Sequence, residues 1–175
     1  MTPMRQLYDT LKQRFPLTDL CEQRDNLAFI SVGQESLRPL IMHLRAHEGF
    51  THLVLLTAVD WIEQQQFQLT YLLSDRLGNR DVGLRVLLQR DDASMETIHD
   101  IWPTAATYQR ELREMFGINF PHSPGVDTPF ILEGWNDIPP YRRDFDTLKY
   151  SQDNYNHRPG RESRDPTQHM QQQLY

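Results

Sequence analysis

Three apolar stretches follow one another in the middle of the chain, with only short polar segments between them. They are LVLLTAVDW at 53–61, QFQLTYLLS at 66–74 and VGLRVLLQR at 82–90. In the second stretch Phe67, Leu69 and Tyr71 fall on one face, which is typical of a strand with one buried side. Connections this short join antiparallel strands, because a parallel pair needs a long crossover. The pattern therefore predicts a largely antiparallel sheet, with a hairpin turn at Gly78-Asn79.

Helices and one further strand are expected around these three strands. Apolar residues at helical spacing predict helices over residues 4–15, from Gln34 or Ser36 to about 48, over 95–102 and over 108–116, and LAFISV at 27–32 is a further strand. Pro16 ends the first helix and Gly49 caps the second. Ser94 is the expected N-cap of the third. This order of elements indicates an α+β fold, with helices packed on one face of a largely antiparallel sheet.

The character of the chain changes after Gly117. Prolines recur at positions 121, 124, 129, 139, 140, 159 and 166, and the text from 151 onward is polar and without periodicity. Such a segment cannot bury much surface on its own. Spaced aromatic residues nevertheless continue to Tyr155, which favours an extended arm that is ordered on another protein over a disordered tail. We therefore predict an α+β domain at residues 1–120 and an extended Pro-rich arm at residues 121–175.

Composition argues against several classes of function. The net charge is −6, with 24 acidic and 18 basic residues, whereas a dedicated nucleic-acid binder usually shows a basic stripe. The one cysteine, Cys21, cannot form an intrachain disulfide, nor can it alone hold an iron–sulfur cluster or a tetrahedral zinc site. No apolar run approaches the roughly 20 residues that span a bilayer. The expected protein is soluble and cytoplasmic.

The sequence offers no convincing reaction centre. His43 and His47 have the i, i+4 spacing of a two-ligand zinc face, but no Glu follows His43 as in HExxH and no third ligand is apparent. Asp60 ends a strand, where a carboxylate commonly caps a turn. No flavin motif, phosphate loop or Ser-His-Asp arrangement is visible. We therefore predict no catalytic, cofactor-binding or metal-ligating residue in this chain.

The most distinctive stretch is YQRELREMFGINF at 108–120. On a helical wheel Tyr108, Leu112, Met115 and Phe116 form one apolar stripe, while Arg110, Arg113 and Glu114 point away. Glu111 lies at the edge of the stripe, where a partly desolvated carboxylate needs an arginine or several donors. Gly117 can adopt the left-handed conformation that closes a helix. These residues predict a capped amphipathic helix, and by themselves they name no function.

The same stretch resembles the signature of the thirty-kilodalton subunit of respiratory complex I, which is the C subunit of NADH:quinone oxidoreductase. The matching residues are Arg110, Glu111, Met115, Phe116, Gly117 and Ile118. Gln109 and Glu114 replace a Glu and an Asp of the family pattern, and PHSPGVDTPFIL at 121–132 departs from it. Further matches are VDW at 59–61, IWPTA at 101–105 and PYRRDF at 140–145. Together they cover about residues 50–146 in the family's order.

The resemblance implies a subunit without a redox centre, in the peripheral arm of a proton-pumping NADH:quinone oxidoreductase. In that family the subunit packs against the hydrogenase-like forty-nine-kilodalton subunit near the quinone site, and its C-terminal segment extends over its neighbours. FMN and iron–sulfur clusters then belong to partner subunits, and the chain meets the membrane only through its partners, on the cytoplasmic side of the inner membrane. The family also occurs in complex I-like membrane-bound hydrogenases and ferredoxin-linked complexes, so the electron donor, the quinone and the pumped ion stay open.

On this interpretation the chain contributes contacts rather than chemistry. The expected partner-binding residues are Arg110, Glu111, Tyr141, Arg142, Arg143, Asp144 and Phe145, and the expected structural residues are Trp61, Phe116 and Gly117. Arginine and aspartate side chains in the arm would make charge-assisted pairs with a partner, and the aromatic rings would be apolar anchors. A free-standing protein-binding module that reuses the fold is the alternative.

Overall fold

The computed structural model describes residues 2–154 of the 175-residue chain. Contacts group the chain into two compact units, Met1–Asp144 and Phe145–Tyr175. The elements of the first unit are α1 (Pro3–Lys12), β1 (Leu17–Arg24), β2 (Leu27–Val32), α2 (Gln34–His47), β3 (His52–Trp61), the 3₁₀ turn η1 (Ile62–Gln64), β4 (Gln66–Asp75), β5 (Arg80–Gln89) and α3 (Ala105–Phe116). The second unit contains α4 (Thr147–Asn154).

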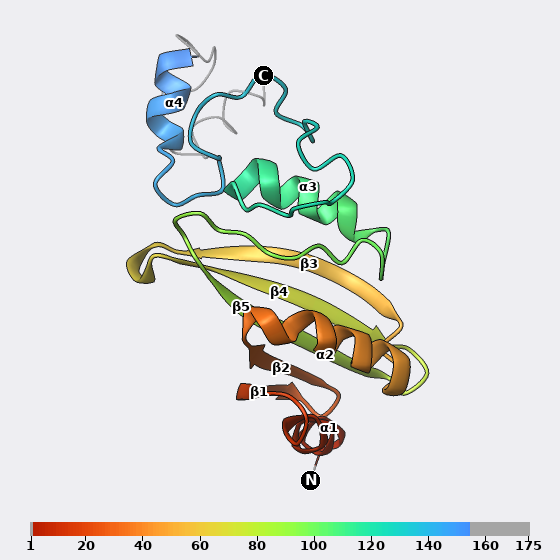
Figure 1. The fold of residues 1–175 in the computed structure, drawn as a ribbon. Helices are drawn as coiled ribbons and strands as arrows, with labels where there is room; N and C mark the ends of the chain where they lie inside the picture. The colour runs from red at the N-terminus through yellow and green to blue at the C-terminus, as the bar shows by residue number, and fades with distance from the viewer. Residues whose placement is uncertain (1, 155–175) are drawn as a thin grey trace, which may run out of the picture. The chain divides into compact units, whose positions relative to one another are not determined.

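The five strands form one sheet in the order β1-β2-β5-β4-β3 (Figure 1). The pairs β1–β2, β3–β4 and β4–β5 are antiparallel, and β2–β5 is parallel. The predicted hairpin between β4 and β5 is present, with Asn79 at a positive φ of 50°. The parallel pair arises because α2, β3 and β4 intervene between β2 and β5 along the chain. The prediction of a largely antiparallel sheet is confirmed.

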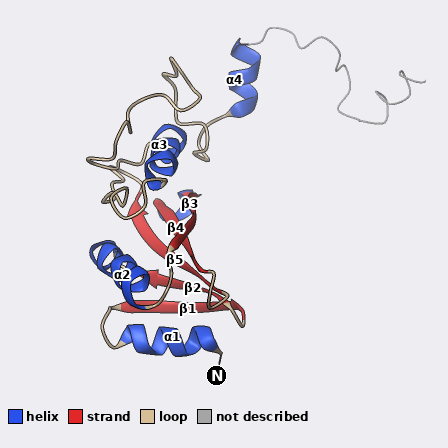
Figure 2. Cartoon of the chain, turned by 90° about the vertical axis from the view of Figure 1, so that its right-hand side faces the viewer, coloured by secondary structure: helices blue, strands red, loops and turns tan. Residues whose placement is uncertain are grey.

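One face of the sheet carries the core. Alternate residues of β4, from Phe67 to Asp75, are buried, while the residues between them are partly exposed. Side chains of α1, α2 and α3 join the same buried cluster, among them Leu11, Ile41 and Leu112. Figure 2 shows α2 and α3 on the same side of the sheet. The predicted α+β fold, with its helices along one face, is therefore confirmed.

The helix predicted over residues 95–102 is wrong. Ser94 instead forms an isolated bridge with Asn119, and Met95 N–H donates to the Asn119 carbonyl at 2.9 Å. The chain then makes a single turn before Pro103. Eight residues ahead of a proline are few for a stable helix, and the pairing with residue 119 satisfies backbone groups that the helix would have used.

Strand β1 was not predicted. Its sequence, LTDLCEQR, mixes acidic, polar and apolar residues, and Leu17 is its one buried residue. It lies at the edge of the sheet, where one neighbouring strand suffices and a buried alternation is not required. Backbone pairing with β2, rather than side-chain burial, defines this strand.

Residues 121–144, which the sequence assigned to the arm, fall within the first compact unit. Residues 145–154 begin the second unit, and residues 155–175 lie outside the described part. The boundary near residue 120 and the packing of the arm on partner subunits stay predictions. Within residues 2–154, no helix combines the length and apolar character needed to cross a membrane.

Candidate interaction site where three sequence motifs meet

Asp60, the acidic residue of the VDW motif, lies near the end of β3 with its side chain only 1% exposed. Arg90, the residue after β5, neutralises this charge. Its Nε donates to Asp60 Oδ1 at 3.0 Å and its Nη2 to Asp60 Oδ2 at 3.2 Å, in the two-point geometry that suits guanidinium and carboxylate. Sheet register brings Asp60 and Arg90 together. Asp60 pairs with Phe67, and Phe67 pairs with Leu88, which is two residues before Arg90 and faces the same side.

The segment 140–144, from the PYRRDF motif, closes on the same ion pair. Arg143 N–H donates to Asp60 Oδ2 at 2.9 Å, and Asp144 Oδ1 accepts from Arg90 Nη2 at 2.6 Å. This hydrogen bond from Arg90 lowers the pKa of Asp144. Burial opposes the charge of Arg90, but the two carboxylates outweigh it and raise the pKa of Arg90. The pair thus fastens a distant chain segment to the sheet.

Arg142 ties the same segment to the end of the signature helix. Its Nε donates to the Phe116 carbonyl at 2.6 Å, and the neighbouring Tyr141 N–H donates to the Met115 carbonyl at 3.0 Å. These are carbonyls of the last turn of α3, which have no partner within the helix. A cation near a helix C-terminus also interacts favourably with the helix dipole. Helix α3 therefore ends on groups supplied by residues 141 and 142.

Aromatic rings fill the space between the three motifs. Phe116 meets Phe67 edge to face at a centroid distance of 5.9 Å and Tyr141 at 5.7 Å. The guanidinium groups of Arg90 and Arg142 lie 5.7 and 5.4 Å from the Phe67 centroid. Such contacts are attractive because the ring face is electronegative. Phe67 is fully buried, and of the two cations Arg90 is buried and Arg142 is half-buried.

Gly117 is required at this junction for two reasons. Its φ is +76°, so it occupies the left-handed cap position that the sequence predicted. A Cβ added there would meet Arg142 Nη2 at 2.9 Å. The absence of a side chain therefore lets Arg142 approach the end of α3.

Glu114 does not point into solvent as the helical wheel suggested. Its carboxylate accepts backbone N–H groups of Phe130, Ile131 and Leu132, at 2.7, 2.9 and 3.2 Å. One carboxylate thereby satisfies three consecutive donors of a loop that has no regular structure. The loop that departs from the family pattern is consequently anchored on α3 as well.

Some of the residues predicted as partner-binding or structural lie at the junction, and the others lie away from it. The junction unites Phe116, Gly117, Tyr141, Arg142, Arg143 and Asp144. The guanidinium of Arg110 instead lies 5.1 Å from the Phe130 centroid, and Glu111 is half-buried. Trp61 is 42% exposed at the end of β3. Phe145 belongs to the second unit, where its ring lies 5.5 Å from that of Tyr150.

Sequence reasoning missed Arg90, Glu63 and Phe67 as members of this site. Arg143 Nη1 contacts both carboxylate oxygens of Glu63 at 2.7 Å, on the 3₁₀ turn after β3. A signal for Arg90 does exist, because this charged residue comes directly after the end of a strand with buried apolar residues, separated from VLL only by Gln89. Its carboxylate partners lie 30 and 54 residues away, so local patterns do not name them.

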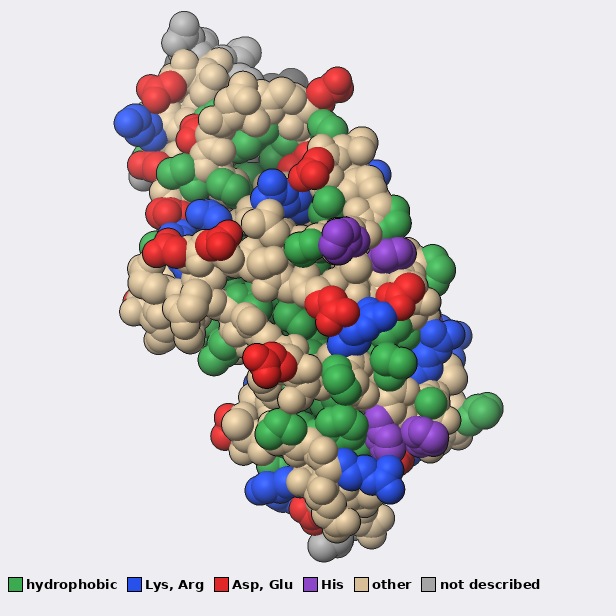
Figure 3. All heavy atoms as spheres, in the orientation of Figure 1, with side chains coloured by type: hydrophobic (Ala, Val, Ile, Leu, Met, Phe, Trp, Pro, Cys, Tyr) green, Lys and Arg blue, Asp and Glu red, His purple; other side chains and the backbone are tan. Residues whose placement is uncertain are grey.

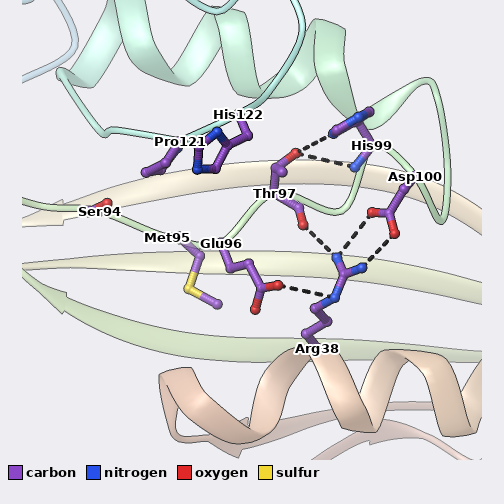
Figure 4. A pocket seen from close by; sticks show the side chains of 9 residues that line it. All are labelled: Arg38, Ser94, Met95, Glu96, Thr97, His99, Asp100, Pro121 and His122. Carbon is purple, nitrogen blue, oxygen red and sulfur yellow. Dashed lines mark hydrogen bonds and ion pairs between the residues drawn. The ribbon is translucent and has the colours of Figure 1, made fainter.

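A pocket of about 460 Å³ lies apart from the junction, between α2 and the segments 94–100 and 121–122 (Figure 4). Arg38 crosses it, with Nη1 donating to the Thr97 carbonyl at 2.7 Å and to Asp100 Oδ1 at 3.0 Å. Its Nε lies 3.2 Å from Glu96 Oε1. The hydrogen bond from Arg38 lowers the pKa of Asp100. The charged side chains Arg38, Glu96 and Asp100 are paired with one another. These pairs hold the segment 94–100 against α2.

Residues 2–154 contain no group of three or more His, Cys, Asp or Glu side chains placed to hold a metal ion. Acidic and basic side chains are interspersed over the face drawn in Figure 3, without a broad basic area. The fold and the junction define a small α+β protein whose distinctive residues hold one segment of the chain on another.

Comparison with known proteins identifies the family. The description "Respiratory-chain NADH dehydrogenase, 30 Kd subunit" matches residues 30–151, and the chain belongs to this family. It is 32% identical over 124 residues to the C subunit of the NADH-quinone oxidoreductase of Rhodobacter capsulatus, covering 69% of this chain and 61% of that one. It is 29% identical over 116 residues to the C subunit of Moorella thermoacetica, covering 66% of this chain and 78% of that one. The chain matches only 19% of the length of the C/D 2 subunit of Aquifex aeolicus, at 32% identity over 65% of its own.

Two solved structures share the fold. One is a chain in the structure of the membrane-bound sulfane sulfur reductase, an archaeal respiratory membrane complex, with a TM-score of 0.82, 24% identity and coverage of 93% of this chain and 96% of that one. The other is Nqo5, the trypsin-resistant fragment 1–134, with a TM-score of 0.59, 22% identity and coverage of 71% and 98%. The family and fold expected from the signature are confirmed. The chain therefore belongs to the family of the C subunit of NADH-quinone oxidoreductases.

Proposed function

We propose that the chain is a non-redox structural subunit of the peripheral arm of a proton-pumping NADH:quinone oxidoreductase, packed against the hydrogenase-like forty-nine-kilodalton subunit near the quinone site. One observation carries the proposal. The family motifs converge on a junction whose charged groups bind chain segments, and no acid–base pair or metal-ligand cluster is assembled there among residues 2–154. A site of this kind shapes a surface for assembly.

The redox cofactors of the complex then belong to other subunits. FMN and the iron–sulfur clusters reside in partner subunits, and no nucleic acid is involved. The chain is placed on the cytoplasmic side of the inner membrane and reaches it only through its partners. Family membership supports this placement, because the relatives are named as subunits of NADH-quinone oxidoreductase.

The partner contacts are proposed at Arg110, Glu111 and the segment 141–145. Glu111 is half-buried and makes no hydrogen bond or ion pair with the described residues, so its carboxylate is available for a partner's donor. Tyr141 is 57% exposed although its backbone is fixed, as expected of an apolar anchor. Arg142, Arg143 and Asp144 already have partners within the chain, so their contribution to assembly is to hold this surface in shape and to present their remaining polar groups.

A charge exchange distinguishes the two roles of Arg143. Arg143→Glu removes its pair with Glu63, and Arg143→Glu combined with Glu63→Arg restores that pair in reverse. If the pair within the chain is what matters, the double variant assembles as the wild type does. If Arg143 also contacts an acidic group of a partner, assembly stays impaired in the double variant. Native gel electrophoresis of membranes that carry each variant measures the assembled fraction.

The second candidate is an equivalent subunit of a related membrane complex, of the hydrogenase or ferredoxin-linked type. The observation that favours it is the fold likeness to a chain of the archaeal respiratory membrane complex, which extends over 93% of this chain. Both candidates share the structural role, and they differ in the partners that handle electrons.

Native purification through a tag on this chain, followed by mass spectrometry, tests the proposal. Co-purification of a hydrogenase-like large subunit with iron–sulfur and flavin subunits, together with NADH oxidation, is the expected result. A nickel–iron or sulfur-reducing partner set would move the chain to the second candidate. A chain recovered alone would contradict both and leave the free-standing binding module.

A further inference from the structure

The face of the sheet opposite the helices carries large apolar side chains among polar ones such as Gln68 and Thr70. The strand register places one set of side chains on it: Phe29, Leu55, Val59, Trp61, Leu72 and Leu87, here called the open face. Leu87 is 52% exposed, and Val59 and Leu55 are 41% and 39% exposed. These residues come from four neighbouring strands and lie on the same face of the sheet. Large apolar side chains exposed together on one face are typical of an interaction site.

One cation is built into the open face. Phe29 lies across Gly83 of the neighbouring strand, where an added Cβ would meet the Phe29 ring at 2.3 Å. The guanidinium of Arg85 lies 4.2 Å from the centroid of that ring. Glycine thus allows the ring to lie flat against the sheet, and the ring supports the guanidinium from below. The position of the charge is consequently fixed by the fold.

Arg85 differs from Arg90 and Arg38. Arg90 and Arg38 each bind two carboxylates, whereas the side chain of Arg85 has no hydrogen bond or ion pair with residues 2–154, and its Nε is buried without an acceptor. A desolvated guanidinium N–H without an acceptor is unfavourable. The side chain of Arg85 therefore offers a positive charge and an unsatisfied N–H donor to a partner molecule.

We infer that the open face docks on an apolar surface of another subunit of the same complex, and that an Asp or Glu of that subunit binds Arg85. This inference rests on the proposed function, because it needs a multisubunit assembly. A carboxylate amid aliphatic side chains complements the face in both charge and polarity.

Photo-crosslinking in the assembled complex tests the contact. A photoreactive phenylalanine analogue replaces Leu87, whose exposed position tolerates a larger side chain. The matched control places the same analogue at Leu77, which is fully exposed in the β4–β5 turn. We expect Leu87 to crosslink to another subunit at a peptide that contains an acidic residue, and Leu77 to give little product. Crosslinks to a second copy of the chain, or to its own residues 155–175, would overturn the inference.

A charge reversal at Arg85 measures how much this contact contributes to assembly. We expect Arg85→Glu to reduce the assembled fraction at limiting expression by about tenfold, since a central charged contact is replaced by repulsion. Reversal of the crosslinked carboxylate to Lys should restore assembly with Arg85→Glu. Arg76→Glu, at an exposed position in the β4–β5 turn, is the control, and circular dichroism of each purified chain establishes folding. Unchanged assembly with Arg85→Glu, while the wild type still recovers its partners, would refute the docking face and leave the proposed function standing. A wild-type chain recovered alone would refute the proposed function itself.

Discussion

Arg90 and Arg38 each bind two carboxylates and fasten an irregular segment to the folded domain, but they do so in different surroundings. At the motif junction the side chains of Arg90 and Asp60 are 9% and 1% exposed. At the pocket Arg38 is 23% exposed and its partner Asp100 is 51% exposed. Equal numbers of ion pairs therefore do not mean equal contributions to stability. Water screens the Arg38 cluster, whereas the Arg90 cluster depends on complete pairing.

This difference explains what the family motifs have in common. VDW, the signature helix and PYRRDF supply the groups that surround the buried pair, which is intolerant of partial loss. The Arg38 cluster uses residues outside these three motifs. Burial rather than the count of charges distinguishes the site that constrains the chain from the site that merely ties a loop.

The largest expected effect is the removal of the buried cation. Arg90→Met should lower the free energy of unfolding by about 3 kcal/mol or more, because Asp60 is left charged and unpaired in the core. Arg38→Met, the matched change at the exposed cluster, should lower it by about 1 kcal/mol or less. Urea denaturation of the two variants measures the difference. Equal losses would break the comparison.

Substitutions of two glycines compare the crowded junction with an open loop. Gly117→Val should destabilise the domain by about 2–3 kcal/mol, because a β-branched residue is strained at positive φ and its Cβ meets Arg142. Gly134 also has a positive φ, of 78°, but no atom lies within 4 Å of an added Cβ. Gly134→Val should therefore show the backbone strain alone and a smaller loss. Thermal unfolding of both would reject the crowding argument if their losses were the same.

The loop anchored by Glu114 should respond more weakly. Glu114→Gln replaces one accepting oxygen by a donor that faces three backbone N–H groups, and we expect a loss of about 1 kcal/mol. Local loosening at residues 130–132 should appear as faster limited proteolysis there. Glu133→Gln, at an exposed position in the same loop, is the control and should change neither quantity.

The smallest effect concerns pH. Hydrogen bonds from Arg90 and Arg38 lower the pKa values of Asp144 and Asp100, so the unfolded chain binds more protons than the folded one. Their stabilising contributions are present above the unfolded pKa, about 3.9, and are lost as pH falls through the lower folded pKa. Both carboxylates are more than one-third exposed, so each contribution is small. Asp144→Asn should weaken the acid dependence of the urea midpoint slightly more than Asp100→Asn. A stronger effect of Asp100→Asn would reverse the ranking by burial.

Much of the sheet could be predicted from sequence, and the failures have physical causes. Strands β3, β4 and β5 were recognisable because each is a run rich in apolar and branched residues, and β4 buries alternate residues throughout. Strand β1 does not, because it is an edge strand of mixed composition. The segment 95–102 carries the apolar spacing of a helix, but its backbone pairs with Asn119, a contact that no local pattern specifies.

The site was predictable only in part for the same reason. The signature helix and Gly117 were recognisable from spacing and from the cap that glycine provides. The partner of Asp60 was not, because Arg90 reaches it through strand register across three strands. Glu114 was placed on the polar side of its helix, where it in fact binds a loop that the helical wheel does not contain. Long-range pairing, rather than local propensity, decides these positions.

Hydrogen exchange of the amides of residues 139–144 tests the central claim most directly, namely that the family motifs hold this segment on the domain. In the wild type the N–H groups of Tyr141 and Arg143, which donate to Met115 and Asp60, should exchange slowly. In Asp60→Asn, protection should fall at Arg143 and its neighbours, while Arg38→Met should leave it unchanged. Equal protection of this segment in the wild type and in Asp60→Asn would contradict the account.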